Sequence, residues 1–107
     1  MILTTTDSVE GKRITAYLGV VSGETVMGTN LFKDFFAGVR DIVGGRTKSY
    51  EGVLGDAKQE ALQDLAEKAK KLGADAVVGI DLDYEAISGN DRTLLMVTAN
   101  GTAVKLG

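Results

Sequence analysis

The hydrophobic positions of residues 54–72 recur with the period of an α-helix. The apolar residues are Leu54, Ala57, Ala61, Leu62, Leu65, Ala66, Ala69 and Leu72. Spacings of three and four residues are typical of an amphipathic helix. Lysines gather in its last turn, where cations suit the helix dipole. We therefore predict a helix that begins between residues 47 and 56 and ends at Gly73, a good left-handed C-cap.

A second helix is predicted over residues 31–43. One stripe is formed by Leu31, Phe35, Val39 and Ile42, and it is widened by Phe32, Phe36 and Val43. This apolar arc is broader than one sheet face requires, and exposed aromatic surface usually marks an interface. We take the segment as a sign of oligomerisation. Gly44-Gly45 is expected to end this helix as a turn between two helices.

After Gly73, residues 76–87 alternate as a β-strand does. One predicted face carries Ala76, Val78, Ile80, Leu82, Tyr84 and Ala86, and the other carries Val77, Gly79, Asp81, Asp83 and Glu85. The polar loop at 88–91 and the apolar run at 93–99 predict a hairpin. Asn100-Gly101 is expected to form a turn or a bulge before residues 102–106 continue the strand.

Two strands are expected before the helices. A short one lies within residues 1–6, and a longer one begins after Arg13. In the longer one the predicted faces are Ile14, Ala16, Leu18 and Val20 against Thr15, Tyr17, Gly19 and Val21. Gly23 is expected to mark a bulge or a tight bend, and Glu24 beside it a polar turn. The tyrosines, Tyr17, Tyr50 and Tyr84, are expected to pack in the core with a polar tip.

The composition narrows the function classes. The 107 residues predict one domain over residues 1–107, and the net charge of −3 comes from interleaved acids and bases. We therefore expect neither a nucleic-acid nor a membrane partner. Cys is absent and His is absent, which excludes thiolate nucleophiles, Ser-His-Asp triads and soft-metal sites within the chain. Without a disulfide, signal peptide or membrane span, a cytoplasmic protein is expected.

Three carboxylates form the main candidate site. Asp81, Asp83 and Glu85 share a predicted strand face, with Cβ atoms roughly 7 Å apart. Such a row could hold a hard divalent cation through oxygen ligands. The simpler interpretation is a solvated face, or salt bridges to Arg40, Arg46 or Arg92 across a subunit boundary, because an extended row has no loop to wrap an ion. No catalytic or cofactor-binding residue is predicted.

The segment Gly44-Gly45-Arg46-Thr47 precedes a predicted helix and so resembles an anion cradle. It lacks the spacing of a phosphate-binding loop, and a turn with a capping Thr47 is the simpler interpretation. Arg40 and Asp41 near this turn could line a pocket. An ion pair between subunits explains them more simply.

Several blocks of this sequence resemble the YbjQ-like family of small uncharacterised proteins. They are Thr4-Thr-Thr6, Gly19-Val-Val-Ser-Gly-Glu24, Phe35-Phe-Ala-Gly-Val-Arg-Asp-Ile-Val-Gly-Gly-Arg46, Ser49-Tyr-Glu51, Leu72-Gly-Ala-Asp-Ala-Val-Val-Gly-Ile-Asp-Leu-Asp-Tyr-Glu85 and Gly101-Thr-Ala-Val104. The resemblance implies an α+β, two-layer β-α-β-β subunit with a mainly antiparallel sheet, similar to the dodecin subunit. It also implies a ring-shaped homopentamer. Members carry the label "putative heavy-metal-binding domain", and no established activity comes with the family.

The sequence thus predicts a homo-oligomer that is not an enzyme and that serves as a structural assembly or binds a small ligand. One alternative is a divalent-metal-binding protein that uses Asp81, Asp83 and Glu85. A weaker alternative is an enzyme that uses carboxylates with Arg40 or Arg46.

Overall fold

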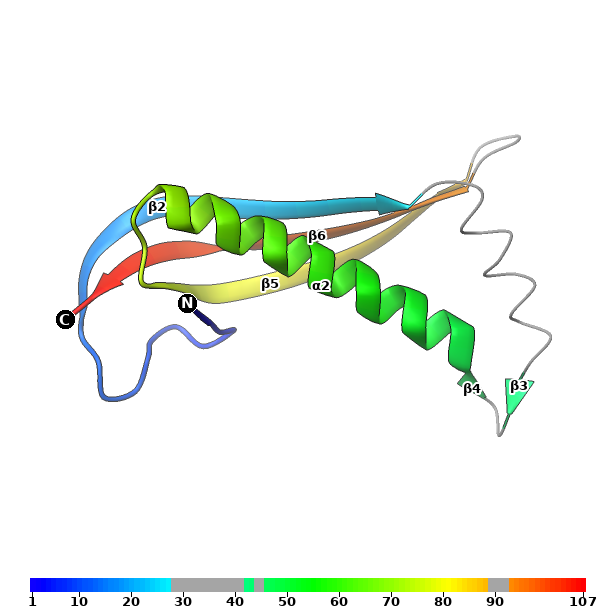
Figure 1. The fold of residues 1–107 in the computed structure, drawn as a ribbon, viewed down its shortest axis with the longest axis horizontal. Coiled ribbons are helices and arrows are strands. Elements are labelled where there is room, and N and C mark those ends of the chain that lie inside the picture. The colour runs from blue at the N-terminus through cyan, green and yellow to red at the C-terminus, as the bar shows by residue number, and fades with distance from the viewer. Residues whose placement is uncertain (28–41, 44–45, 89–92) are drawn as a thin grey trace.

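The fold was obtained as a computed structural model, which describes residues 1–27, 42–43, 46–88 and 93–107. The elements in these ranges are β1 (Ile2–Leu3), β2 (Ile14–Met27), β3 (Ile42–Val43), β4 (Arg46–Thr47), α2 (Lys48–Lys71), β5 (Ala76–Ser88) and β6 (Thr93–Leu106). Figure 1 shows α2 lying across one face of a long sheet.

Four strands form the sheet in the order β1-β5-β6-β2. β6 is antiparallel to both β2 and β5, whereas β1 runs parallel to β5. The predicted α+β class and mainly antiparallel sheet are confirmed, with β1 as the one parallel strand of the described sheet. Among the described residues, the strands of this sheet and α2 follow the order β-β-α-β-β. The predicted β-α-β-β order was therefore incomplete. Both β1 and β2 precede the helix, and they occupy opposite edges of the sheet.

The predicted end of α2 is confirmed. The N–H of Gly73 donates to the carbonyl of Lys70 at 2.9 Å, and the N–H of Ala74 donates to that of Ala69 at 3.1 Å. With Gly73 at φ +82°, these two bonds make a Schellman motif, which satisfies carbonyls left open at the helix end. The helix therefore ends just before Gly73, and β5 begins three residues after that glycine.

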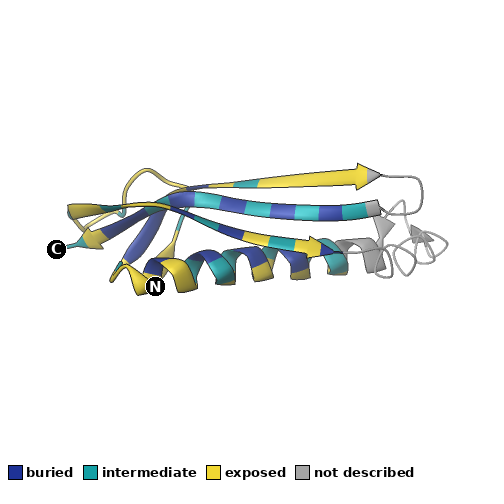
Figure 2. Cartoon of the chain, turned by 90° about the horizontal axis from the view of Figure 1, so that it is seen from above, coloured by how far each residue is buried: buried dark blue, intermediate teal, exposed yellow. Residues whose placement is uncertain are grey.

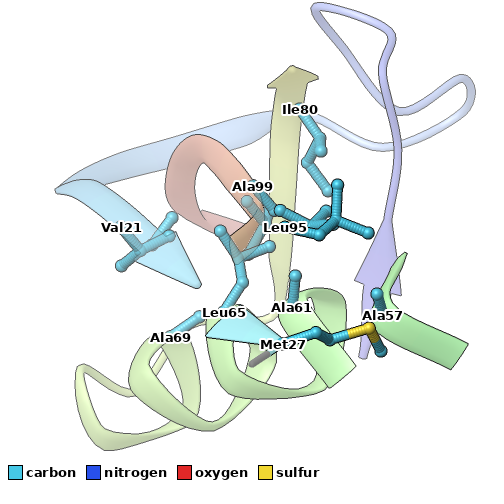
Figure 3. Close-up of a cluster of buried hydrophobic side chains, with 12 residues drawn as sticks. Val21, Met27, Ala57, Ala61, Leu65, Ala69, Ile80, Leu95 and Ala99 are labelled. Carbon is cyan, nitrogen blue, oxygen red and sulfur yellow. The ribbon is translucent and has the colours of Figure 1, made fainter. Parts of the chain in front are cut away.

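The core lies between α2 and the sheet (Figure 3). The helix buries Ala57, Ala61, Leu65 and Ala69 completely, as its periodicity predicts. Against them pack Val21 and Met27 of β2, Leu95, Val97 and Ala99 of β6, and Val77 and Ile80 of β5. Three alanines in the helix stripe let the helix approach the sheet closely, because their side chains end at Cβ.

Gly23 of β2 lies directly against the backbone of α2. It does not form the bulge or bend that was predicted for it. β2 runs unbroken through it, paired with Ala99 of β6. A Cβ placed on Gly23 would overlap the carbonyl oxygen of Ala61 and lie 2.5 Å from the backbone nitrogen of Leu65. Gly23 is thus needed for packing, because no larger residue leaves room for the helix backbone.

A bulge in β5 overturns part of the predicted alternation. The pairing with β6 shifts between Val78 and Asp81, around Gly79 at φ +61°. One extra residue changes which face the following side chains occupy. Val77 and Ile80 therefore both face α2, although they were predicted on opposite faces. Val78 packs on the other face of the sheet, beneath Val9 of the N-terminal loop.

β2 also departs from the predicted alternation, since its pairing with β6 shifts between Tyr17 and Gly19. Leu18 and Val21 both pack into the core against α2. Val20 is 79% exposed, although Leu18 and Val20 were predicted to share a face. The expectation of core tyrosines is wrong for two of the three. Tyr17 is 73% exposed and Tyr84 is 49% exposed, because neither position lies under the helix.

The segment around Gly44-Gly45 differs from the predicted turn between two helices. Ile42–Val43 and Arg46–Thr47 pair as short antiparallel strands, so the predicted first helix does not extend to Val43. The rest of that predicted helix, including its three phenylalanines, lies outside the described residues.

The C-terminal hairpin is confirmed, with β5 and β6 paired up to Ser88 and Thr93. β6 then runs continuously through Asn100-Gly101, where a turn or bulge was expected. The bulge belongs to β5 instead. Gly101 lies opposite it, where a Cβ would come within 2.6 Å of Val77.

Candidate functional site

The three predicted carboxylates do share one surface. Ile80 and Leu82 of β5 pack toward α2, so Asp81, Asp83 and Glu85 point to the opposite face, because side chains alternate along a strand. We call the surface opposite α2 the outer sheet face. It comprises Asp81, Asp83 and Glu85 of β5, Met96, Thr98 and Asn100 of β6, and Val20, Ser22, Glu24 and Val26 of β2. Figure 2 shows the second half of β5 exposed along its length.

Polar residues cross the outer sheet face in two rows. In the first row, Asn100 pairs with Asp81 on one side and with Ser22 on the other. The hydroxyl of Ser22 donates to the side-chain oxygen of Asn100 at 2.7 Å. In the second row, Thr98 lies between Asp83 and Glu24. The three carboxylates of β5, which we call the acidic row, therefore lie beside the hydroxyl and amide groups of β6.

The carboxylates of Asp81, Asp83 and Glu85 repel one another. The negative charge of Asp81 raises the pKa of the Asp83 carboxyl, and a side-chain hydrogen bond to Asp81 raises it further. Loss of water contact and the charge of Glu85 act in the same direction. The pKa of Asp83 is raised because two neighbouring carboxylates repel each other when both are ionised.

The donor set limits which metals these residues fit. The chain has no Cys and no His, so it offers neither the thiolate nor the imidazole that soft heavy metals prefer. Oxygen donors remain, and these suit hard cations. Within the part of the chain that the structure describes, no group of three or more acidic side chains is placed to hold an ion. A flat strand face spreads its carboxylates rather than surrounding an ion with them.

The side chains of the other candidate residues lie outside what the structure describes. Arg46 and Thr47 form β4, beside the start of α2, and nothing is described of their side chains. Arg40, Asp41 and Arg92 lie outside the described residues, as do Gly44 and Gly45. The predicted salt bridges to these arginines, and the anion cradle, therefore remain predictions.

Sequence reasoning missed the role of Asp64. Asp64 forms an ion pair with Lys68, four residues further along the helix, at 3.1 Å, but its carboxylate also accepts the backbone N–H of Glu24 at 3.1 Å. This backbone hydrogen bond, followed by the one from Lys68, lowers the pKa of Asp64. Glu24 lies within β2, not in the turn predicted for it. Spacing along the helix could reveal the Lys68 partner but not the strand.

Asp75 is a second missed carboxylate. It accepts the backbone N–H of Leu106 at 2.9 Å and lies 3.7 Å from the ammonium of Lys105. The Leu106 hydrogen bond is the main cause that lowers its pKa. Asp75 thus ties the end of β6 to the loop before β5. Its position in the Gly73–Ala76 connection gave no signal of this contact.

None of the helical segments that the structure describes is long and apolar enough to cross a membrane.

Comparison with known proteins completes the description. The fold matches the crystal structure of a protein with unknown function, of the DUF74 family, from Pediococcus pentosaceus, with a TM-score of 0.69. The match covers 100% of this chain and 98% of the other at 21% identity, which supports the fold alone. All of residues 1–107 match the YbjQ family, whose description reads "Putative heavy-metal-binding". This chain therefore belongs to the YbjQ family.

Proposed function

We propose that this protein serves as a homo-oligomeric assembly module, a pentameric ring, that does not catalyse a reaction and that binds any small ligand where subunits meet. The ring and its number of subunits come from the resemblance described above. The support from this chain's own geometry is the large surface that the single subunit exposes.

The exposed area carries the proposal. The subunit exposes 6950 Å², whereas a folded monomer of its mass exposes about 5,700 Å². The difference of about 1,300 Å² is more than one partner contributes to a standard interface, about 800 Å². The radius of gyration, 16.8 Å, also exceeds the value of about 13 Å for a compact chain of this length.

The distribution of apolar surface agrees with assembly. Val20 and Ile87 are exposed β-branched residues on the outer sheet face or its margin. α2 covers the other face and contacts β2 much more than β5, so Tyr84 of β5 is half-exposed on that side. An interface between subunits would remove these exposed apolar side chains from water.

The acids and bases argue against catalysis. Among the described residues, no polar or charged side chain is buried. Catalytic acids and bases usually depend on burial and close partners to shift their pKa values by several units. The exposed carboxylates found here instead serve backbone contacts or lie in solvent.

Native mass spectrometry at micromolar concentration tests the assembly. The wild type should appear at five times the subunit mass of 11.2 kDa. Val20→Glu should reduce the assembly while circular dichroism stays unchanged, because Val20 is exposed in the subunit. Gln63→Glu adds the same charge on an exposed position of α2 and should leave the mass unchanged. A monomeric wild type would overturn the proposal.

A second candidate function is hard-cation binding by the acidic row. The raised pKa of Asp83 favours it, because a cation would relieve the repulsion between Asp81 and Asp83. Calcium, magnesium and manganese should each be added separately in a thermal-shift assay, with Asp83→Asn as the comparison. A Tm increase in the wild type that is lost in Asp83→Asn supports this function. Equal Tm values with and without each ion argue against it.

A further inference from the structure

β2 presents a long edge to solvent. It is 14 residues long and ends the sheet order, so β6 pairs with one side while no other described strand pairs with its outer side. A free strand edge offers unpaired N–H and C=O groups to any second strand. Val20 and Val26, which are β-branched and exposed on this strand, are residue types that favour strand pairing.

The middle of this edge is occupied by a side chain of α2. The N–H of Glu24 points away from β6 and donates to the carboxylate of Asp64 at 3.1 Å. Lys68, one helical turn further on, fixes that carboxylate with a second contact at 3.1 Å. Beside it, the hydroxyl of Thr25 donates to the carboxylate of Glu60 at 3.4 Å. Asp64 and Glu60 of the helix thus lie along the edge of β2 that does not pair with β6.

The close approach at Gly23 makes this contact possible. The absence of a Cβ there brings the backbone of Ala61 and Leu65 against β2. Asp64 lies between these two positions in the helix, and its short side chain can reach the strand edge only at such a distance. The packing glycine and the edge contact are therefore parts of one arrangement.

We propose that Asp64 closes the edge of β2 against strand addition by a second copy of this chain. A second copy is the natural occupant, because it carries the same long edge with the same exposed valines. Pairing between the β2 edges of two copies would join one assembly to another, so it would produce particles larger than the wild-type assembly. The proposal is independent of the proposed ring, since it concerns only species larger than the wild-type assembly.

The test compares Asp64→Ala with Glu67→Ala. Both remove one negative charge from α2, but Glu67 is exposed three residues further along the helix and accepts neither the Glu24 nor the Thr25 hydrogen bond. In Asp64→Ala, hydrogen exchange at the Glu24 amide should become about tenfold faster or more, because a hydrogen bond to a charged acceptor is lost. Light scattering should show concentration-dependent particles larger than the wild type. Glu67→Ala should match the wild type in both measurements.

A rescue variant identifies the edge as the surface involved. Adding Val26→Lys to Asp64→Ala places a charge on β2, a known way of blocking strand addition, and should restore the wild-type particle size. Faster exchange without larger particles would overturn the proposal, as would equal association in Glu67→Ala. If Asp64→Ala does not fold, Asp64→Leu, which keeps the length of the side chain but has no acceptor, is judged by the same two measurements.

Discussion

The contact between Gly23 and α2 predicts a large effect of one methyl group. Gly23→Ala adds a Cβ that would overlap the carbonyl oxygen of Ala61 and lie 2.5 Å from the nitrogen of Leu65. Both obstructing atoms belong to the helix backbone, so they cannot turn aside as a side chain can. The helix must move away from β2 for the substituted chain to fold.

The size of that movement sets the loss of stability. Nonbonded contacts are favourable at about 3.5 Å, so the helix must withdraw by roughly 1 Å to clear the Leu65 nitrogen and by more to clear the Ala61 oxygen. A gap of about 1 Å already forfeits about a quarter to a half of the local dispersion attraction. Overpacking usually costs about 1–3 kcal/mol, and a backbone obstruction belongs at the upper end. We therefore expect a loss of about 3 kcal/mol, which corresponds to a decrease in Tm of roughly 12 °C.

Urea unfolding followed by circular dichroism measures this loss, at one fixed protomer concentration because assembly adds to apparent stability. The matched control is Gly55→Ala. Gly55 lies within α2 and a Cβ there meets nothing within 4 Å, so the substitution should stabilise the protein by up to about 1 kcal/mol. The reasoning is refuted if Gly23→Ala lies within about 0.5 kcal/mol of the wild type.

Leu65→Ala should lower the free energy of unfolding by about 2–5 kcal/mol in the same urea assay, because Leu65 is completely buried. Asp83→Asn should raise Tm at pH 7, since repulsion by Asp81 raises the pKa of Asp83 in the folded state. Thermal melts should show this gain shrinking as the pH falls through the raised pKa of Asp83, and absent once the pH is well below about 3.9, where the unfolded carboxyl is also protonated. Asp75→Asn should lower Tm at pH 7, because the Leu106 N–H lowers the pKa of Asp75 and its charged form stabilises the fold. That loss should shrink as acid protonates Asp75 in the wild type.

Each of these has a clear contrary outcome. An unchanged unfolding free energy for Leu65→Ala would mean that the helix stripe does not hold the core. A lower Tm for Asp83→Asn at neutral pH would mean that its charge is stabilised by a partner. A Tm difference for Asp75→Asn that stays constant from pH 7 to pH 3 would show that charge plays no part in its contact with Leu106.

The sequence by itself determined the features that depend on neighbours within a turn or two. The end of α2 at Gly73 follows from the conformation that a C-cap needs. The stripe of Ala57, Ala61, Leu65 and Ala69 follows from helical spacing. The hairpin of β5 and β6 follows from a polar loop between apolar runs. In each case the chemical cause and the structural effect lie close together in the chain.

Only the tertiary structure decided which side chains share a face beyond an irregular position. The bulge at Gly79 puts Val77 and Ile80 on one side, and one extra residue is enough to reverse the predicted alternation. The acidic row kept its shared face because Asp81, Asp83 and Glu85 all follow the bulge. Gly23 looked like a bend until the backbone of α2 was placed against it.

The contact of Asp64 with Glu24 joins residues that are 40 positions apart. Helical spacing is enough to place Lys68 beside Asp64, since residues four apart are neighbours on one helix. The strand partner depended on the distance between helix and sheet, and that distance is set by Gly23 and the small side chains of the core. No local pattern encodes it, because it arises only when the two layers pack.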